Sequence, residues 1–331
     1  MTNLTEKRLL QIMNSFSGLK IAVVGDMMLD CYFRGDVKRI SPEAPVPVLE
    51  VDSEFYRFGG AANVALNILK LGGIPFPIGV IGNDNDGKIF LSLAEDSKIN
   101  LSGFIIDNDR PTTTKTRVIA HNQHLVRIDK ESKKYLSSEV QNKIVKYIED
   151  NVDVLDGIIL QDYNKGVLTP SLIEIITSLA NNKNKLITVD PKFNNFFLFK
   201  NVTVIKPNRK EAEDVLGMKL RNDEDISLAG SRILEQTNAE YVVLTLSEEG
   251  IAVFEKNKPE KRMPTKAQKV ADVSGAGDTV ISTLTMALAA KANIFEASYI
   301  ANYAGGIVCE EVGIIPIEKN KLIDTIMNGN K

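Results

Sequence analysis

The chain has 331 residues, of which 44% are hydrophobic and 25% are charged, and its formal net charge is −3 at pH 7. This balance supports a large core, and it excludes the strongly basic field that recruits nucleic acid or an anionic membrane. Cys31 and Cys309 are too few for a disulfide scaffold or a cysteine-ligated zinc site. We recognise no targeting segment and no apolar run long enough to span a membrane, so we expect a cytoplasmic protein with no membrane partner.

Short apolar runs rich in Val and Ile alternate with helical patterns along the chain. The apolar runs cover 21–25, 157–160, 186–189, 202–205 and 241–244, and helical periodicity covers 61–71, 86–97, 137–149, 170–180, 224–236, 278–290 and 294–309. Buried strands that alternate with helices predict a doubly wound, mainly parallel sheet with helices on both faces. We therefore expect a single α/β domain over residues 1–331.

Two segments interrupt this alternation. Residues 33–58 begin with an extended, proline-spaced stretch, and residues 103–129 include alternating polar and apolar positions that predict a hairpin with its turn near Asn122. We expect both segments to form a small β-lid, with two ordinary surface excursions as the alternative. His121 and His124 have no acidic or cysteine neighbour in the sequence, so we expect exposed lid residues there and not a metal pair.

The first apolar run ends in the sequence VVGDMMLD, which contains Asp26 and Asp30. In open α/β sheets ligands lie beyond the carboxyl ends of the strands, and carboxylates accept hydrogen bonds from sugar hydroxyls. Gly59 and Gly60 allow the backbone to approach a ligand closely, and Asn63 follows in the first turn of a helix. An Asp-rich turn followed by a small-residue packing helix is the alternative.

The segment VIKPNRKEAEDVLG follows another predicted strand and begins a helix. Asn208 and Glu211 are three residues apart and therefore lie on one face of this helix start, where they also match a capping box. Lys206 could reach a phosphate. Thr245, Ser247 and Gly250 end the next predicted strand, and we expect them to line a nucleotide pocket.

The most informative segment is ADVSGAGDTV, residues 271–280. Gly275, Ala276 and Gly277 precede an apolar helix, whose N-terminus favours an anion, and Asp278 lies in its first turn. An ionised carboxylate beside such donors can deprotonate an alcohol while the donors stabilise a transferring phosphoryl group. An N-capped core helix is the alternative. The segment lacks the Gly-Lys-Ser/Thr ending of a Walker A loop, and no G-x-G-x-x-G loop follows the first strand, which disfavours an NAD-dependent dehydrogenase.

These motifs resemble those of the ribokinase-like (PfkB) sugar kinases. DVSGAGDTV is similar to the second signature of that family, with Val273 where Thr is usual, and GGAANVALNILKLGG (59–73) is similar to the first. The resemblance implies that Asp278 is the catalytic base, that ATP and Mg²⁺ are used, and that Asn208 and Glu211 position the ion, usually through water. It also implies sugar contacts for Asp26, Asp30, Gly59, Gly60 and Asn63, and it allows a monovalent cation.

Four further segments resemble the family members that phosphorylate D-glycero-β-D-manno-heptose 7-phosphate at its anomeric hydroxyl. They are 39–51, 112–129, 160–168 and 190–192. The resemblance implies the 1,7-bisphosphate as product, toward the ADP-heptose of lipopolysaccharide core. The segment LQDYNKG departs from the usual Ser-Asp-Tyr-Ala-Lys-Gly, and Leu246 stands where Arg is frequent.

A phosphorylated sugar requires cations, and the candidates for its phosphate are Arg117, Arg127, Lys165 and Lys192. Each is equally compatible with a solvated surface charge. Residues 266–272 and 302–305 are expected to flank the adenine. We expect a homodimer through the lid, and no adenylyltransferase domain, because no His-x-Gly-His motif is present. The rival functions are a kinase of the same fold for a fructose phosphate or ribose, and a non-catalytic sugar-binding regulator.

Overall fold

The computed structural model describes residues 4–121, 123–265, 272–311 and 313–329. The helices are α1 (Glu6–Asn14), α2 (Ala61–Lys70), α3 (Asn85–Asp96), α4 (Ser138–Asn151), α5 (Pro170–Asn182), α6 (Arg209–Leu216), α7 (Asp223–Thr237), α8 (Ala276–Ala289), α9 (Ile294–Cys309) and α10 (Lys319–Gly329). The strands are β1 (Lys20–Gly25), β2 (Met27–Ile40), β3 (Pro47–Gly60), β4 (Ile74–Gly82), β5 (Phe104–Asp107), β6 (Thr114–Ala120), β7 (Gln123–Lys130), β8 (Gly157–Gln161), β9 (Leu186–Asp190), β10 (Val204–Ile205), β11 (Tyr241–Thr245), β12 (Ile251–Glu255) and β13 (Lys261–Met263).

Within the described residues, nine strands form the main sheet in the order β13-β12-β11-β10-β9-β8-β1-β4-β5. The pairs from β5 to β11 are parallel, whereas β12 and β13 pair antiparallel at one edge. The chain leaves β1 toward β4 on one side and later continues from β8 on the other side. The sheet therefore has its topological switch point between β1 and β8, where open α/β sheets bind ligands.

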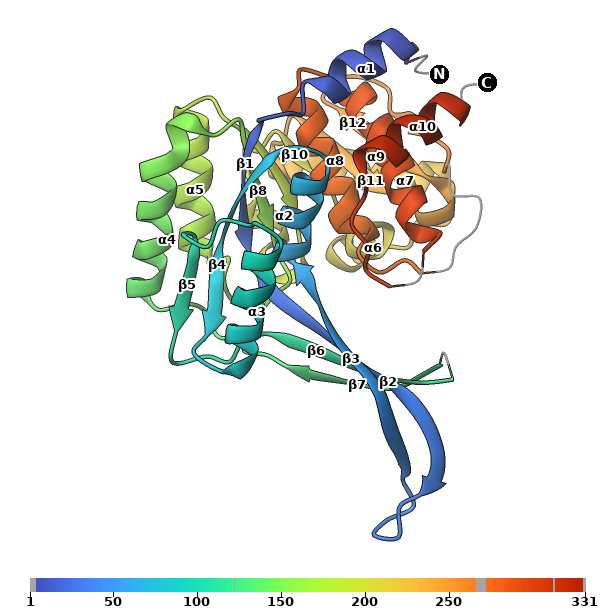
Figure 1. The fold of residues 1–331 in the computed structure, drawn as a ribbon. Coiled ribbons are helices and arrows are strands. Elements are labelled where there is room, and N and C mark those ends of the chain that lie inside the picture. Colours follow the sequence, from blue (N-terminus) through green and yellow to red (C-terminus); the bar gives the residue numbers. More distant parts are fainter. Residues whose placement is uncertain (1–3, 122, 266–271, 312, 330–331) are drawn as a thin grey trace.

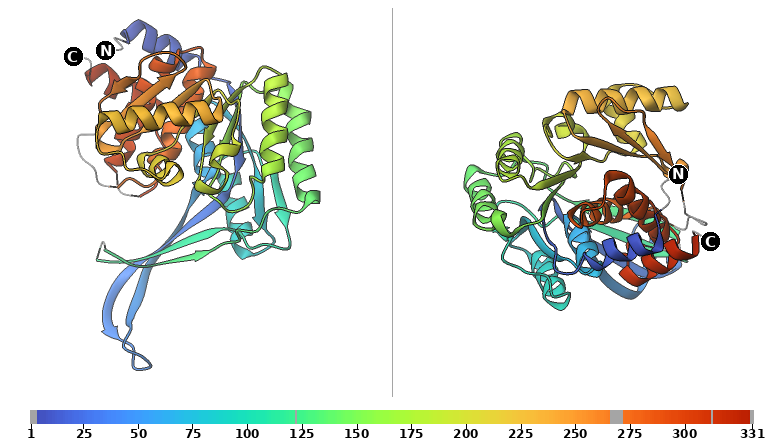
Figure 2. Two further views of the ribbon diagram at one scale, coloured as in Figure 1. Left: turned by 180° about the vertical axis from the view of Figure 1, so that it is seen from behind. Right: turned by 90° about the horizontal axis from the view of Figure 1, so that it is seen from above.

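Helices cover both faces of this sheet, as Figures 1 and 2 show. In β1, Ile21 and Val23 face one core with α1, α2, α8 and α9, while Ala22 and Val24 face a second core with α4, α5 and α7. Because all four side chains are fully buried, this strand reads as a continuous apolar run. The predicted doubly wound α/β fold is confirmed.

The lid is a separate four-stranded sheet in the order β3-β2-β6-β7. It projects from the carboxyl ends of the main strands, and both chain termini lie at the opposite end of the molecule (Figures 1 and 2). Strands β2 and β3 pair antiparallel from Met27–Gly60 out to Ile40–Pro47. Their inner ends therefore lie beside the main sheet and their outer ends extend into solvent.

The lid differs from its predicted boundaries. Residues 103–129 divide between two sheets, because Phe104–Asp107 pairs parallel with β4 and extends the main sheet. The lid strands of the first segment begin at Met27 and end at Gly60, beyond the expected 33–58. The predicted hairpin is present as β6 and β7, and its expected turn residue, Asn122, lies outside the described residues. No helix in the described part of the chain is long and apolar enough to cross a membrane.

Candidate active site

Three strand ends meet at the switch point. The register aligns Gly25 of β1 with Gln161 of β8, and Gln161 with Asp190 of β9. Helix α8 begins beside these ends, so that Asp278 comes within hydrogen-bond distance of Gln161. Residues that are far apart in the sequence are therefore gathered around one carboxylate.

Asp278 is held by three donors. Its Oδ2 accepts from Asn63 Nδ2 at 2.8 Å, and its Oδ1 accepts from Tyr163 OH at 2.7 Å and from Gln161 Nε2 at 3.0 Å. Asn63 lies in the first turn of α2, so the glycine-rich corner after β3 and the glycine-rich start of α8 meet through this contact. The sequence predicted both glycine motifs, and the structure brings them together.

Burial raises the pKa of Asp278 to about 6, although the hydrogen bonds from Asn63 and Tyr163 partly oppose this effect. A buried carboxyl resists ionisation because the charged form loses its hydration. At pH 7.5 the group is still mostly ionised, and it is a stronger base than an exposed aspartate. These are the properties that a general base for an alcohol requires.

Two lysines flank Asp190 next to the helix start. Lys206 is only 2% exposed and lies 3.2 Å from Asp190 Oδ2, and Lys192 Nζ lies 3.8 Å from Asp190 Oδ1. Burial would raise the pKa of Asp190, but the two lysines hold it below the ordinary value. Lys192 also pairs with Glu211. Burial lowers the pKa of Lys192, but the negative charges of Asp190 and Glu211 outweigh this effect, and the net pKa is raised.

The N-terminus of α8 supplies backbone donors to the same place. Gly275 is the N-cap residue with φ +81°, a conformation that favours glycine. A Cβ on Gly277 would lie 3.7 Å from both Asp190 Oδ2 and Lys206 Nζ. Ala276 N–H donates to Val273 O at 3.3 Å, so the expected role of Ala276 in holding a phosphoryl group is not matched. The donors that the helix start leaves for an anion are the N–H groups of Gly275, Gly277 and Asp278.

Asn208 and Glu211 form the capping box that the sequence allowed. Asn208 Oδ1 accepts from Glu211 N at 2.9 Å, and Glu211 Oε2 accepts from Asn208 N at 2.8 Å. The described residues contain no group of three His, Cys, Asp or Glu side chains that could enclose a metal. Oxygen ligands without an all-protein cage suit Mg²⁺, which keeps several waters and binds substrate phosphates.

The three residues expected beside the nucleotide follow or end β11. Thr245 forms a bridge with Asn208, which places it next to the capping box. Gly250 has φ +90°, and a Cβ there would lie 2.0 Å from Met263 O, so the turn with Ser247 requires glycine. Of the expected adenine-flanking residues, 266–271 lie outside the described residues, and Asn302 donates to Pro264 O at 2.7 Å.

Asp26 has a different environment from the one expected of a sugar ligand. Its carboxylate accepts from the backbone N–H groups of Tyr163, Lys165 and Val167 at 2.8, 3.1 and 3.2 Å. Burial raises its pKa, and these backbone donors oppose the rise. These hydrogen bonds hold the loop after β8, so Asp26 positions Tyr163 against Asp278, and its predicted sugar contact stays a prediction.

Asp30 and Gly59 lie together at the base of the lid. A Cβ on Gly59 would lie 2.5 Å from Asp30 Oδ2, and Asp30 Oδ1 pairs with Arg117. Burial raises the pKa of Asp30, and the charge of Arg117 opposes this. The cross-strand register puts Arg57 opposite Asp30, and its guanidinium donates to Ile314 O at 2.7 Å. Asp30 is therefore better placed than Asp26 for a sugar contact.

The four cations predicted to bind the sugar phosphate lie in two different places. Arg127 is cross-strand to Arg117, pairs with Asp129 and is 57% exposed, so it lies on the lid. Lys165 pairs with Glu131 at 2.6 Å near the lid base. Lys192 lies instead with Glu211 and Asp190, on the side of the expected nucleotide. The structure thus separates Lys192 from the other three candidates for the sugar phosphate.

Sequence reasoning missed Gln161, Tyr163 and Asp190. All three lie at or just after the carboxyl end of a buried strand, which is the signal that could have found them. The predicted strands stopped one residue early, at Leu160 and Val189, and the polar residues that follow were left unassigned as site residues.

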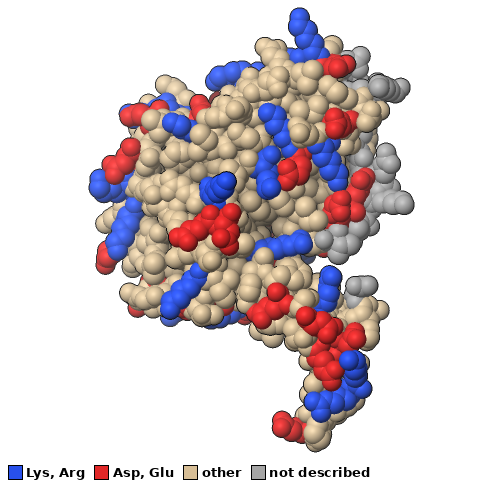
Figure 3. All heavy atoms as spheres, in the orientation of Figure 1, with Lys and Arg blue, Asp and Glu red and all other residues tan. Residues whose placement is uncertain are grey.

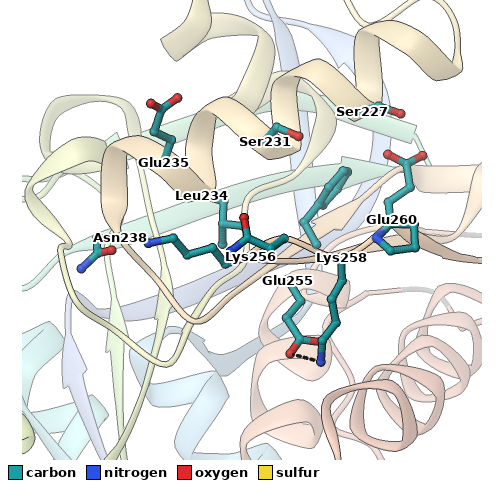
Figure 4. A pocket seen from close by; sticks show the side chains of 12 residues that line it. Ser227, Ser231, Leu234, Glu235, Asn238, Glu255, Lys256, Lys258 and Glu260 are labelled. Carbon is teal, nitrogen blue, oxygen red and sulfur yellow. Dashed lines mark hydrogen bonds and ion pairs between the residues drawn. The ribbon is translucent and has the colours of Figure 1, made fainter.

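The outer surface carries mixed charges and a pocket away from the predicted site. In the view of Figure 3, Lys and Arg are interspersed with Asp and Glu on the main body and along the lid, without a continuous basic surface. A pocket of about 700 Å³ lies between α7 and the β12–β13 turn, lined by residues such as Ser231, Phe254 and Lys258 (Figure 4). None of the predicted site residues lines this pocket.

Comparisons with known proteins show the family and the fold of this chain. The model of the pfkB family carbohydrate kinases matches residues 19–320. The bifunctional protein HldE of Helicobacter acinonychis is 43% identical over 295 residues, and that of Geobacter sulfurreducens is 40% identical over 304 residues. These matches cover 89% and 92% of this chain, but only 63% and 62% of the relatives' length.

Solved structures share the fold at low identity. Ribokinase of Arabidopsis thaliana, complexed with ribose and ATP, superimposes with a TM-score of 0.73 and 19% identity, covering 93% of this chain and 99% of that one. Phosphofructokinase-2 of Escherichia coli, in complex with substrates and products, gives 0.77 and 18%, covering 95% and 100%. At these identities the likeness establishes the fold.

Proposed function

Because the chain belongs to the pfkB family of carbohydrate kinases, we propose that it transfers the γ-phosphoryl group of ATP to the anomeric hydroxyl of D-glycero-β-D-manno-heptose 7-phosphate. The product is the 1,7-bisphosphate, which serves ADP-heptose formation for lipopolysaccharide core. The four segments that resemble heptose 7-phosphate kinases support this acceptor. The chain spans about 63% of the length of the relatives it matches, so any second activity of such a protein is outside this proposal.

The observation that carries the proposal is the position of Asp278. Its carboxylate lies in the first turn of α8, between donors from α2 and from the loop after β8, and its pKa is raised to about 6 by burial. Asp278 takes the proton of the anomeric hydroxyl as that oxygen forms a bond to the γ-phosphorus. The bond from phosphorus to the bridging oxygen breaks, and ADP leaves with that oxygen.

Groups of this chain stabilise the negative charge on the transferring phosphoryl group. In this proposal the backbone N–H groups of Gly275, Gly277 and Asp278, together with the lysines beside Asp190, Lys192 and Lys206, stabilise the transferring phosphoryl group. Asn208 and Glu211 would hold Mg²⁺ through water, and the ion when bound neutralises phosphate charge. Thr245, Ser247 and Gly250 line the nucleotide side in this proposal. Dependence on a monovalent cation stays a prediction, which turnover in potassium and tetramethylammonium salts would check.

The acceptor's phosphate is assigned to the lid. Arg117 and Arg127 are cross-strand neighbours on one face of the lid, with Lys165 near its base. Planar guanidinium groups bind phosphate through paired hydrogen bonds. Lys192 is not assigned to this phosphate, because its contacts are with Glu211 and Asp190.

We also propose a homodimer through the lid and a cytoplasmic location. The outer lid strands β3 and β7 are sheet edges, and Val126 and Ile128 on β7 are about half exposed. Exposed strand edges with apolar side chains favour pairing with a second copy.

A substrate panel tests the proposed reaction. The purified chain is assayed for ADP release with Mg-ATP and each of heptose 7-phosphate, fructose 6-phosphate, fructose 1-phosphate and ribose, and the product is identified by phosphorus NMR. We expect kcat/KM for heptose 7-phosphate to exceed the others by at least about 100-fold, and the product to be the β-1,7-bisphosphate. A better acceptor in the panel would overturn the heptose assignment, and no turnover with any acceptor would favour a sugar-binding regulator.

A further inference from the structure

Gln161 is the last residue of β8 and is fully buried between two carboxylates. Its side-chain Nε2 donates to Asp278 Oδ1 at 3.0 Å and to Asp190 Oδ2 at 3.1 Å. Its carbonyl oxygen Oε1 is also buried, and it has no hydrogen-bond partner among the described residues. The amide nitrogen thus donates two hydrogen bonds, whereas the amide oxygen accepts none from the described residues.

Rotation of the amide cannot relieve this imbalance. A flipped amide would turn Oε1 toward the two carboxylates and remove both hydrogen bonds. Asp190 is kept ionised by the neighbouring lysines, so the side that faces it must be a donor. The hydrogen-bond network therefore fixes Nε2 toward the carboxylates and Oε1 away from them.

A buried acceptor without a donor is rare in native proteins and calls for a partner that the structure lacks. The triphosphate of ATP offers acceptors only, so it cannot satisfy a carbonyl oxygen. The acceptor sugar offers hydroxyl donors, and the reacting hydroxyl must approach Asp278, which Gln161 touches. A neighbouring hydroxyl of the same sugar is thus the nearest donor that the reaction brings.

We infer that Gln161 has two tasks in catalysis, and this inference rests on the proposed reaction. Its Nε2 positions Asp278 for proton transfer, and its Oε1 accepts a hydrogen bond from the sugar hydroxyl beside the one that is phosphorylated. Gln161 is therefore a specificity-determining residue for polyhydroxylated acceptors.

The positioning task has a readout that does not require turnover. Donation from Nε2 favours the ionised form of Asp278, so its loss should raise the pKa of that carboxyl. The other charged or titratable groups facing Asp278 are Tyr163 from the loop after β8, Asp190 at the end of β9, Lys192, and Lys206 after β10. All of them are unchanged in a Gln161 variant.

Gln161→Met tests both tasks, because methionine has nearly the same length but neither donor nor acceptor amide groups. Carbon-13 NMR follows the carboxyl carbon of Asp278, assigned by its loss in Asp278→Asn, as pH is changed. We expect its pKa to rise by about one unit in Gln161→Met. An unmoved titration in a folded variant would overturn the positioning task. Gln161→Ser, which keeps a small polar side chain, serves in the same way where the methionine variant does not fold.

The recognition task is measured with an acceptor that lacks one hydroxyl. For the wild type, we expect kcat/KM for heptose 7-phosphate to exceed that for its 2-deoxy analogue by about 100-fold or more, and for Gln161→Met this preference should shrink at least about tenfold. Equal losses with both acceptors would overturn the contact with the hydroxyl. If heptose 7-phosphate is not a substrate, the proposed function fails alone, and the best acceptor of the panel is compared with its analogue lacking the adjacent hydroxyl.

Discussion

At the scale of single residues, the site depends on how one carboxylate is kept both buried and ionisable. Asn63, Gln161 and Tyr163 donate to Asp278, and the lysines beside Asp190 add positive charge nearby. Burial nevertheless dominates and raises the pKa of Asp278 to about 6. The group is thus basic enough to accept an alcohol proton and acidic enough to be ionised at neutral pH.

Replacement of the base by its isostere tests this arrangement. Asp278→Asn keeps the shape and can hydrogen-bond, but it cannot accept the proton. We expect kcat to fall by about 10²–10⁴-fold while ATP binding, measured by calorimetry, changes little. Asp324→Asn, at an exposed position on α10, is the matched control and should be unchanged. Near-normal turnover of Asp278→Asn would remove it as the base.

The pH dependence of turnover reports the same carboxyl. As pH falls through about 6, Asp278 becomes protonated and loses its function as a base, so kcat/KM should decline on the acidic side with an apparent pKa near 6. The measurement is kcat/KM for the sugar phosphate between pH 5 and pH 8, because this ratio reports groups of the enzyme before the sugar binds. No decline down to pH 5 would mean that the carboxyl behaves like an exposed aspartate.

Lys192 distinguishes the two ends of the site. If it acts on the transferring phosphoryl group, Lys192→Met should lower kcat by about 10²–10³-fold and leave KM for the sugar phosphate within a few-fold, with partial recovery in Lys192→Arg. Lys183→Met, which removes a more exposed lysine paired with Asp153, is the control. A large rise in KM for the sugar phosphate at unchanged kcat would instead indicate that Lys192 binds the phosphate of the sugar, as the sequence predicted.

At the scale of elements, the corner between β3 and α2 positions Asn63. Gly60 has φ +57° and ψ −138°, and a Cβ there would lie 2.4 Å from Asp26 O. The N–H of Ala61 donates to the same carbonyl oxygen at 3.0 Å. This corner therefore joins the lid, the first helix of the site and the end of β1, and it tolerates no side chain.

Gly60→Ala should be more destabilising than an alanine at an uncrowded glycine. We expect a loss of about 2–3 kcal/mol or more in the free energy of unfolding from urea titration, because strain at positive φ adds to the clash. Gly217→Ala is the matched control, since Gly217 has φ +62° but nothing within 4 Å of its Cβ position, and it should lose about 1 kcal/mol. Equal losses would show that the backbone contact with Asp26 is easily relieved.

At the scale of the whole molecule, the lid has two different faces. The register places Asp30, Arg57 and Arg117 on the face that carries the sugar-side charges, with Tyr32 and Phe55 stacked at 4.7 Å between them. Val126 and Ile128 lie on the other face and are 49% and 55% exposed. One sheet can thus contribute to the site with one face and offer an apolar surface with the other.

The proposed dimer should depend on that apolar face. The double change Val126→Asp with Ile128→Asp is expected to convert a dimer to a monomer in sedimentation velocity at micromolar concentration, because it places charges in a desolvated contact. Val154→Asp, at a position that is 51% exposed on the main body, should leave the dimer intact. A wild-type chain that sediments as a monomer would contradict the proposal.

Much of the fold and part of the site follow from local sequence. Predicted helices such as 61–71 and 294–309 correspond closely to α2 and α9, and β1, β8 and β11 lie where apolar runs predicted strands. The short helices α1 and α10, the edge strands β12 and β13 and the central strand β4 were not predicted. Terminal helices and edge strands carry weak periodic signals, because they bury only part of their surface. In β4, Pro75 and Pro77 weaken the strand signal.

The sequence by itself determined the buried strands, the glycines and Asp278, because periodicity and the need for close backbone approach are properties of neighbouring residues. Only the tertiary structure decided the partners of that carboxylate. Gln161 and Tyr163 reach Asp278 from a strand end more than 100 residues away in the chain, and Lys192 pairs with Glu211 and not with the lid. Side chains from separate strand ends share a site only when the order of strands in the sheet brings those ends together, and local patterns do not encode that order.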